Sequence, residues 1–249
     1  MLRIEAAAYG NRWRSVSPAA KASLAFAGLL AALLTKHPAH NAGHALFFCL
    51  LTLWGARVSW RLYGPILFSA TAFLLLSSLS LLLSLDIGES GTLTWQWAPS
   101  ALDTLATLGM RSLAALSALL WLVFTTPLPD LIHLCRRLTV PDVLLDLMVL
   151  CYRLLFVLTE VLRDGRIAQA ARLGHSRTRL SLRALGLLIA NLTLQVWQRA
   201  QALHGAAESR NARSTLRFLA PAFAHPRRDM ALCGSASLLL LSLVAWSRF

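Results

Sequence analysis

The sequence predicts an all-α polytopic membrane protein with about five transmembrane helices and a cytoplasmic coupling domain of amphipathic helices. Two features of the composition support this class: 57% of the 249 residues are hydrophobic and only 14% are charged, with a mean hydropathy of +0.59. A soluble domain of ordinary composition has about 25% charged residues. The third observation is that the apolar residues form runs close to the roughly 20 residues with which a helix spans a bilayer.

Five apolar segments are predicted to cross the membrane. Pro65–Leu85 is the clearest of them because it contains no charged side chain. The fourth segment contains Asp103 and Arg111, and an ionisable residue inside a span is a candidate functional residue. We expect Arg111 to pair with Asp103, two turns earlier, or with a polar group on another helix. The predicted spans are residues 20–35, 45–60, 65–85 and 101–126, which form a membrane domain over 1–126, and 230–246 within the C-terminal segment 229–249.

The basic residues predict the orientation of these spans. The formal net charge is +13, yet the segment DIGESGTLTWQWAPS (residues 86–100) has no lysine or arginine. Cytoplasmic loops of membrane proteins carry the excess of lysine and arginine. We therefore expect a multi-pass protein of the bacterial inner membrane with its N-terminus and residues 127–228 in the cytoplasm, where inner-leaflet lipids meet part of the charge. No nucleic-acid partner is expected, because the basic residues alternate with long apolar runs.

Residues 127–228 are predicted to contain helices of another kind. A short helix is expected around Leu131–Leu138, followed by a long helix after Pro141 and a second long helix over Thr178–Ser209, after Gly174. The first long helix should lie at the inner face of the membrane with its apolar side towards the bundle. A span over residues 143–162 is the alternative, but each charge near its middle would cost about 2.5–3.5 kcal/mol. Its charged residues recur at spacings of 4, 7, 7 and 4, on one face: Asp142, Asp146, Arg153, Glu160 and Asp164.

Motifs of catalysis are absent from the sequence. It contains no G-x-x-x-x-G-K-[ST] phosphate-binding loop, so the chain is not itself a P-loop ATPase, and no G-x-S-x-G or H-E-x-x-H motif. The three histidines His37, His40 and His44 have the spacing of a metal site on a helix. Pro38 and Gly43 favour a solvated loop here, and a transient external metal contact is the alternative. We therefore expect no resident metal site.

Two motifs occur at the ends of the long cytoplasmic helices. The first helix ends in AQAARLG and the second in RAQALHGAAESRNA. Together with AAYGNRWRSVSPAAK and TTPLPDLIHLCRRLTVPDVLLDLMVLCYR, these stretches resemble the transmembrane T component of energy-coupling factor transporters, of the CbiQ type from cobalt uptake systems, over nearly the whole chain. That family has an Ala-Arg-Gly motif at the end of each of two coupling helices. The motifs map onto Ala171-Arg172-Leu173, with Gly174 one place late, and onto Ser209-Arg210-Asn211, which keeps the arginine only.

The resemblance implies a non-catalytic subunit of an ATP-driven importer. Each coupling helix would dock its arginine in a groove of one of two cytoplasmic ATP-binding subunits, with Arg166, Glu208 and Arg213 supporting the contact. The motion would pass to a separate substrate-binding membrane subunit, CbiM-like, for cobalt or nickel, alongside a small accessory membrane subunit. ATP and magnesium would be bound by the ATPase partner, and no cofactor is implied for this chain.

Two other classes of function remain as alternatives. A self-sufficient transporter or channel would show paired intramembrane acids, broken helices in matching halves or an internal repeat. A polytopic membrane enzyme would show clustered Asp, His or Cys at a membrane face. The sequence offers the pair Asp103–Arg111 to the first and the three histidines to the second. The coupling subunit is therefore the favoured interpretation.

Overall fold

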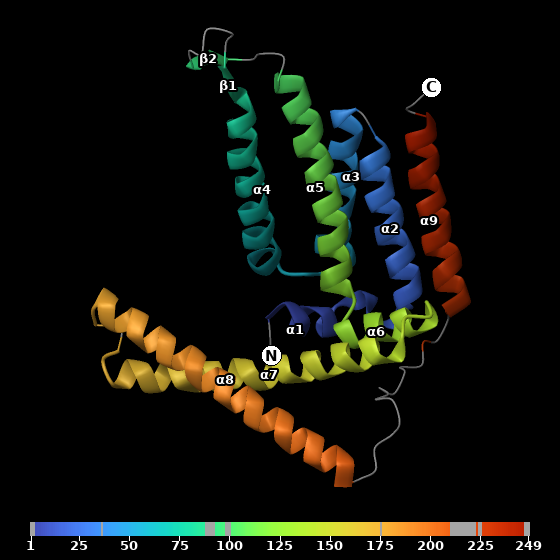
Figure 1. Cartoon of the computed structure of the whole chain (residues 1–249). Coiled ribbons are helices and arrows are strands. Elements are labelled where there is room, and N and C mark those ends of the chain that lie inside the picture. The colour runs from blue at the N-terminus through green and yellow to red at the C-terminus, as the bar shows by residue number, and fades with distance from the viewer. Residues whose placement is uncertain are drawn as a thin grey trace. The chain divides into compact units, whose positions relative to one another are not determined.

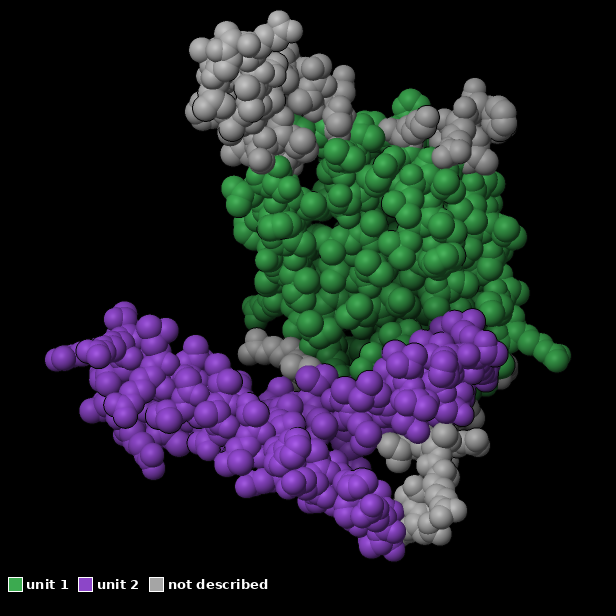
Figure 2. Space-filling view, viewed as in Figure 1, with its two compact units in different colours: residues 1–131, 220–249 green, residues 132–219 purple. Residues whose placement is uncertain are grey.

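The computed structural model describes residues 3–35, 37–87, 93–97, 101–174, 176–209, 223 and 226–246, with the side chains of 3, 78–104, 245 and 246 excepted. The chain divides into two compact units, which Figure 2 colours separately. Unit 1 comprises residues 1–131 and 220–249, and unit 2 comprises residues 132–219.

Unit 1 is a bundle of helices. Helix α5 packs against α2, α3 and α4, and α9 packs against α2, which is seen in the bundle of Figure 1. The short N-terminal helices α1 and η1 precede the bundle, and α3 continues into the π-helical turn η2. The fold class predicted from the sequence is thereby confirmed. The bounds are α1 Arg3–Gly10, η1 Arg12–Ser15, α2 Pro18–Leu34, α3 Pro38–Leu50, η2 Leu51–Gly55, α4 Trp60–Leu82, α5 Ala101–Thr125 and α9 Pro226–Trp246.

The second and third predicted spans begin too late. The second helix starts at Pro38 instead of residue 45, because proline fits the first helical position, where no N–H is needed. That helix ends at Gly55, and Arg57 then adopts a left-handed conformation with φ of 55°, which interrupts helical continuation. Helix α4 therefore begins at Trp60, ahead of Pro65.

Two short strands lie at the end of the third predicted span and in the segment predicted as an outer loop. Strands β1 (Leu83–Ile87) and β2 (Leu93–Trp97) pair antiparallel, with Leu83 opposite Trp97. The sequence of β2, LTWQW, contains the threonine and tryptophan residues that are enriched in strands. The sequence did not predict this hairpin: residues 83–85 were expected to be part of a helix, and 86–100 to be a loop.

The core of unit 1 combines small and aromatic residues. Ala20, Ala25 and Ala118 are buried, which lets the backbones of α2 and α5 approach closely. The fully buried Trp121 packs edge-on against Trp13, with 5.5 Å between ring centroids. This contact attaches the N-terminal segment to the C-terminal half of α5.

Unit 2 is built from the end of α6 (Leu128–Arg137), from α7 (Asp142–Ala171) and from α8 (Thr178–Ser209). Helix α6 begins three residues earlier than predicted, and α8 has the predicted bounds. Helices α7 and α8 cross where a Cβ on Gly165 would lie 2.5 Å from Leu188 Cδ1. Ile132, Leu145 and Val149 form a small core between α6 and α7.

Length and composition alone select a different set of membrane-spanning candidates within the described residues. Three helices qualify, over Trp60–Ser77, Leu105–Thr125 and Thr178–Ser209, while α2 is apolar but shorter. The third is α8, which the sequence predicts at the membrane surface because Asn191, Thr193 and Gln195 interrupt its apolar stretch. Its location in or at the membrane stays a prediction.

Candidate coupling site

The first arginine motif forms the C-terminal cap of α7. Ala171 is the last helical residue, Arg172 is the cap, and Leu173 adopts a left-handed conformation with φ of 55°. The N–H of Leu173 donates to the carbonyl of Ala170 (3.0 Å), and the N–H of Gly174 donates to that of Gln169 (2.9 Å). This pair of bonds is the Schellman arrangement, which satisfies the last carbonyls of a helix. The backbone that carries Arg172 is therefore held in place.

The backbone geometry explains why Gly174 comes one place later than the glycine of an Ala-Arg-Gly motif. The left-handed position of a Schellman cap is usually glycine, and here it holds the exposed Leu173. Gly174 is needed for a different reason: a Cβ there would lie 3.0 Å from the Gln169 carbonyl oxygen and 3.3 Å from the Cβ of Ala184 on α8. The turn between α7 and α8 thus uses glycine for close approach and tolerates leucine at the strained position.

Replacing Leu173 by glycine is expected to raise the free energy of unfolding by about 1 kcal/mol, because leucine pays roughly that amount for a left-handed conformation. Gly174→Ala is the matched control and should lower it, because the new methyl group meets a backbone oxygen. Thermal unfolding of the detergent-solubilised protein measures both. A destabilised Leu173→Gly variant would contradict the assigned cap.

A polar recess adjoins Arg172. It has a volume of about 450 Å³, and its polar lining comes from both long helices. The Arg172 side chain is exposed, and its guanidinium has no hydrogen-bond or ion-pair partner among the described residues. An exposed, unpaired guanidinium beside polar groups is suited to receive carboxylate or carbonyl oxygens from another protein. The polar lining residues are Asp164, Gln169, Arg172, Asn191 and Gln195.

The second motif lies at the other end of α8. Ser209 is its last helical residue and donates through Oγ to the Ala206 carbonyl (3.0 Å). Glu208 contacts His204 at 3.3 Å, with both side chains exposed. At about 1.5 Å per residue, a straight helix of 32 residues is about 48 Å long, so Ala171 and Ser209, the described starts of the two motifs, lie far apart. Arg210, Asn211 and Arg213 lie outside the described residues, and Arg166 is exposed on α7.

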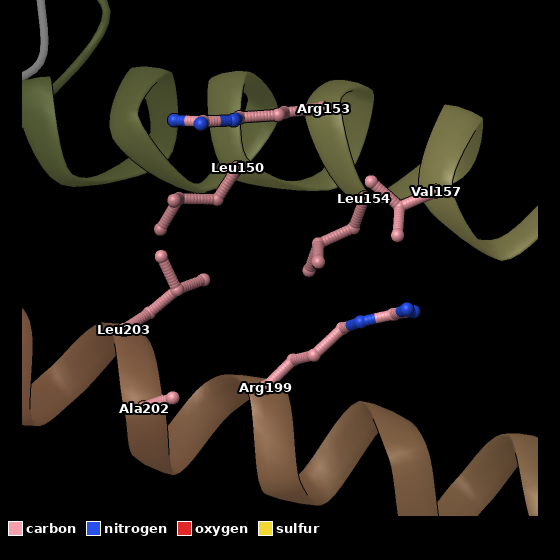
Figure 3. A pocket seen from close by; sticks show the side chains of 7 residues that line it. All are labelled: Leu150, Arg153, Leu154, Val157, Arg199, Ala202 and Leu203. Carbon is pink, nitrogen blue, oxygen red and sulfur yellow. The ribbon is translucent and has the colours of Figure 1, made fainter.

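A second groove lies between α7 and α8, with an almost entirely apolar lining and a volume of about 340 Å³. Figure 3 shows Leu150 of α7 and Leu203 of α8 pointing towards one another across it. The guanidinium groups of Arg153 and Arg199 extend in opposite directions in the same view. These two cations therefore do not converge on a single anion site.

The half-buried charge of α5, Arg111, contacts the end of another helix. Arg111 donates from Nη2 to the carbonyl of Thr35 at the end of α2, over 3.2 Å. Asn41 donates to the same carbonyl, over 3.4 Å. The Asp103 side chain lies outside the described residues, so the predicted ion pair stays a prediction. The alternative partner, a polar group on another helix, is confirmed.

The prediction of a solvated loop is wrong for His40 and His44, which are helical, and it holds for the exposed His37. His37 is the residue before α3, and His40 and His44 lie on its first turns. His44 is buried and lines an apolar groove against α9, together with Leu240. Across the described residues, no group of three or more His, Cys, Asp or Glu side chains is placed to hold a metal ion.

Comparison with known proteins places this architecture in a family. The family model of CbiQ, described as a cobalt transport protein, matches residues 10–214. The chain belongs to the CbiQ family. It is 34% identical over 217 residues to the cobalt transport protein CbiQ of Rhodobacter capsulatus, covering 87% of this chain and 86% of the relative.

Two archaeal relatives are longer, and the chain spans about a third of each. It is 40% identical over 94 residues, or 38% of its length, to an uncharacterized protein of Methanocaldococcus jannaschii, of which this covers 35%. It is 28% identical over 180 residues, or 70% of its length, to a putative fused cobalt transport protein CbiMQ of Methanocorpusculum labreanum, of which this covers 30%.

Sequence reasoning missed two polar residues of this CbiQ family member at the coupling site. Asn191 and Gln195 stood out only as polar residues within an apolar stretch, yet they line the recess beside Arg172. Their spacing of four residues places them on one face of α8. That spacing is visible in the sequence and marks one polar face of α8. The face lines a recess only because α7 packs against α8, which the sequence does not show.

Proposed function

We propose that this CbiQ family member is the transmembrane coupling subunit of an ATP-driven importer for a divalent transition metal, with cobalt as the leading substrate. The observation that carries the proposal is Arg172, whose exposed guanidinium at the end of a 30-residue helix has no partner within the part of the chain that the structure describes. Its backbone is held by the two hydrogen bonds of the cap. A held helix end transmits displacement, whereas a frayed end would absorb it.

The chemistry of arginine suits a contact with a partner's groove. A guanidinium is always charged and presents a planar fork of donors to carboxylate or carbonyl oxygens. Arg210 follows the last helical residue of α8 in the sequence, so the chain offers a second arginine after a helix about 48 Å long. Two cytoplasmic ATPase subunits would each receive one of these ends. They would bind ATP and magnesium and perform the hydrolysis.

A substrate-binding membrane subunit is the second proposed partner. The printed name of the Methanocorpusculum relative joins CbiM to CbiQ in one chain, which supports a CbiM-like partner for this chain. The choice between cobalt and nickel would lie in that subunit, and a small accessory membrane subunit completes the proposed complex. The N-terminus and the coupling helices would face the cytoplasm of a bacterial cell.

The apolar surface of the coupling helices is consistent with such a partner. Val143 of α7 and Leu182 and Trp197 of α8 are more than half exposed. Large exposed apolar residues mark surfaces that meet a protein or a membrane. Contacts without fixed polar pairs would allow the partner to slide as the helix ends move, and inner-leaflet lipids would cover the remainder.

Co-expression with candidate ATPase and CbiM-like subunits tests the proposal. We expect the ATPase subunits to co-purify with the wild-type chain. Arg172→Ala should lower metal-stimulated ATP turnover by about 10- to 100-fold, since a charge-assisted hydrogen bond contributes about 1.5–3 kcal/mol. Combining it with Arg210→Ala should abolish turnover.

The matched control is Arg179→Ala, which removes an exposed arginine near the start of α8. It should leave turnover within twofold of wild type. If the ATPase subunits never co-purify with the wild-type chain, the coupling function is wrong. If the double arginine variant keeps full turnover, Arg172 and Arg210 do not couple this chain to the ATPase subunits.

A further inference from the structure

A buried polar network connects the N-terminal segment of unit 1 to the end of α5. Asn11 is buried and donates from Nδ2 to the carbonyls of Phe124 (3.0 Å) and Thr125 (3.2 Å). Lys21 is fully buried and donates from Nζ to the carbonyls of Thr125 (2.9 Å) and Trp13 (3.1 Å). The last carbonyls of a helix lack partners of their own and carry partial negative charge. Residues 11–21 therefore cap α5 from a distant part of the sequence.

The same segment contacts the two helices of unit 1 that flank unit 2 in the sequence. Unit 1 continues to Leu131, and Arg14 forms an ion pair with Asp130 of α6, whose side chain is only 4% exposed. On the other side of unit 2 in the sequence, the Ser17 N–H donates to Asp229 Oδ2 in the first turn of α9, over 3.0 Å. Two residues only three positions apart thus hold an acid on each of these two helices.

The ion pair between Arg14 and Asp130 is built to resist separation. Asp130 is almost fully buried, and a buried carboxylate deprived of its cation is strongly destabilising. The Arg14 guanidinium also lies over the Tyr9 ring, 5.1 Å from its centroid. The first turn of α6 is therefore anchored on the unit 1 side by a pair that does not exchange readily with water.

We propose that residues 11–21 are a clamp that anchors α6 and α9, the two helices of unit 1 that flank unit 2 in the sequence, and that Arg14 and Asp130 are positioning residues for the coupling step. This inference rests on the proposed function. Displacement applied at the ends of α7 and α8 would reach unit 1 through the chain that joins the two units. A flexible connection between the two units would absorb that displacement, whereas the clamp would transmit it to α5 and α9.

The test uses the whole complex in proteoliposomes and measures cobalt taken up per ATP hydrolysed. Arg14→Gln and Asp130→Asn should each leave the complex assembled and ATP hydrolysis within twofold, while cobalt per ATP falls at least fivefold. The swap Arg14→Asp with Asp130→Arg should recover part of that ratio. A structural role alone would lower both activities together. The control Arg12→Gln, on the same segment but exposed, should leave the ratio unchanged.

A second variant covers the contact with α9 and the case in which the Arg14 variants do not fold. Asp229→Ala removes the acceptor of the Ser17 N–H at a partly exposed carboxylate, so the chain should still assemble. It should also lower cobalt per ATP. An unchanged ratio in assembled complexes of either kind overturns the clamp. Failure of the wild-type complex to assemble would instead refute the proposed function.

Discussion

Replacing Gly28 by valine is expected to lower the free energy of unfolding by about 3 kcal/mol or more, at the upper end of what overpacking a core costs. A Cβ at Gly28 of α2 would lie 2.4 Å from two ring atoms of Phe48 and 3.3 Å from the Cβ of Ala118. Both neighbours are fully buried, so the ring has no space into which it could withdraw. Valine would therefore push α2 away from α3 and α5.

Gly43→Ala is the matched control on a neighbouring helix. A Cβ at Gly43 of α3 would meet no atom within 4 Å. Alanine in a helix is more favourable than glycine by about 0.8–1.0 kcal/mol, so this variant should be slightly more stable than wild type. The thermal unfolding midpoints of both variants, measured in one detergent, test both expected changes in stability. If Gly28→Val unfolds at the wild-type temperature, the packing of α2 on Phe48 is wrong.

The sequence predicts the existence of the helices of unit 1 well because their signal is local. An apolar run of sufficient length indicates a helix without knowledge of its neighbours, and the five runs correspond to α2, α3, α4, α5 and α9. The boundaries near Arg57 were missed because a left-handed residue other than glycine leaves no mark in the composition. The requirement for glycine at position 28 was also invisible, since it depends on a ring twenty residues later in the chain.

The coupling site was predictable only in part. The resemblance supplied Arg172, and helical periodicity supplied the helix that carries it. The left-handed conformation at Leu173 could not be inferred, because leucine is a poor residue for that position and glycine followed it immediately. Lys21 shows the same limit in another way. It lies at the start of the first predicted span, 20–35, where nothing in the sequence indicates that its side chain is buried, and the structure buries it completely.

Replacing Lys21 by methionine is expected to lower the free energy of unfolding by about 3 kcal/mol, although methionine is apolar and similar in length. The ammonium group donates to the carbonyls of Thr125 and Trp13, and each hydrogen bond to a charged group contributes about 1.5–3 kcal/mol. Without it the Trp13 carbonyl keeps only the Val16 N–H as a donor, while Thr125 keeps the weaker contact from Asn11. Loss of two such bonds, partly offset by the gain in apolar burial, gives the expected value.

The control for charge is Arg12→Met, which removes an exposed cation from the same segment and should leave the unfolding midpoint unchanged. If both variants are equally stable, net charge decides stability here and the cap on α5 does not. If Lys21→Met alone unfolds early, the buried ammonium is what joins the N-terminal segment to α5.

Arg14 and Ser17 lie between Asn11 and Lys21, so loosening this cap should also weaken the hold on Asp130 and Asp229. Lys21→Met should therefore lower cobalt uptake per ATP at temperatures where the protein remains folded, which links the stability of the clamp to its proposed mechanical role.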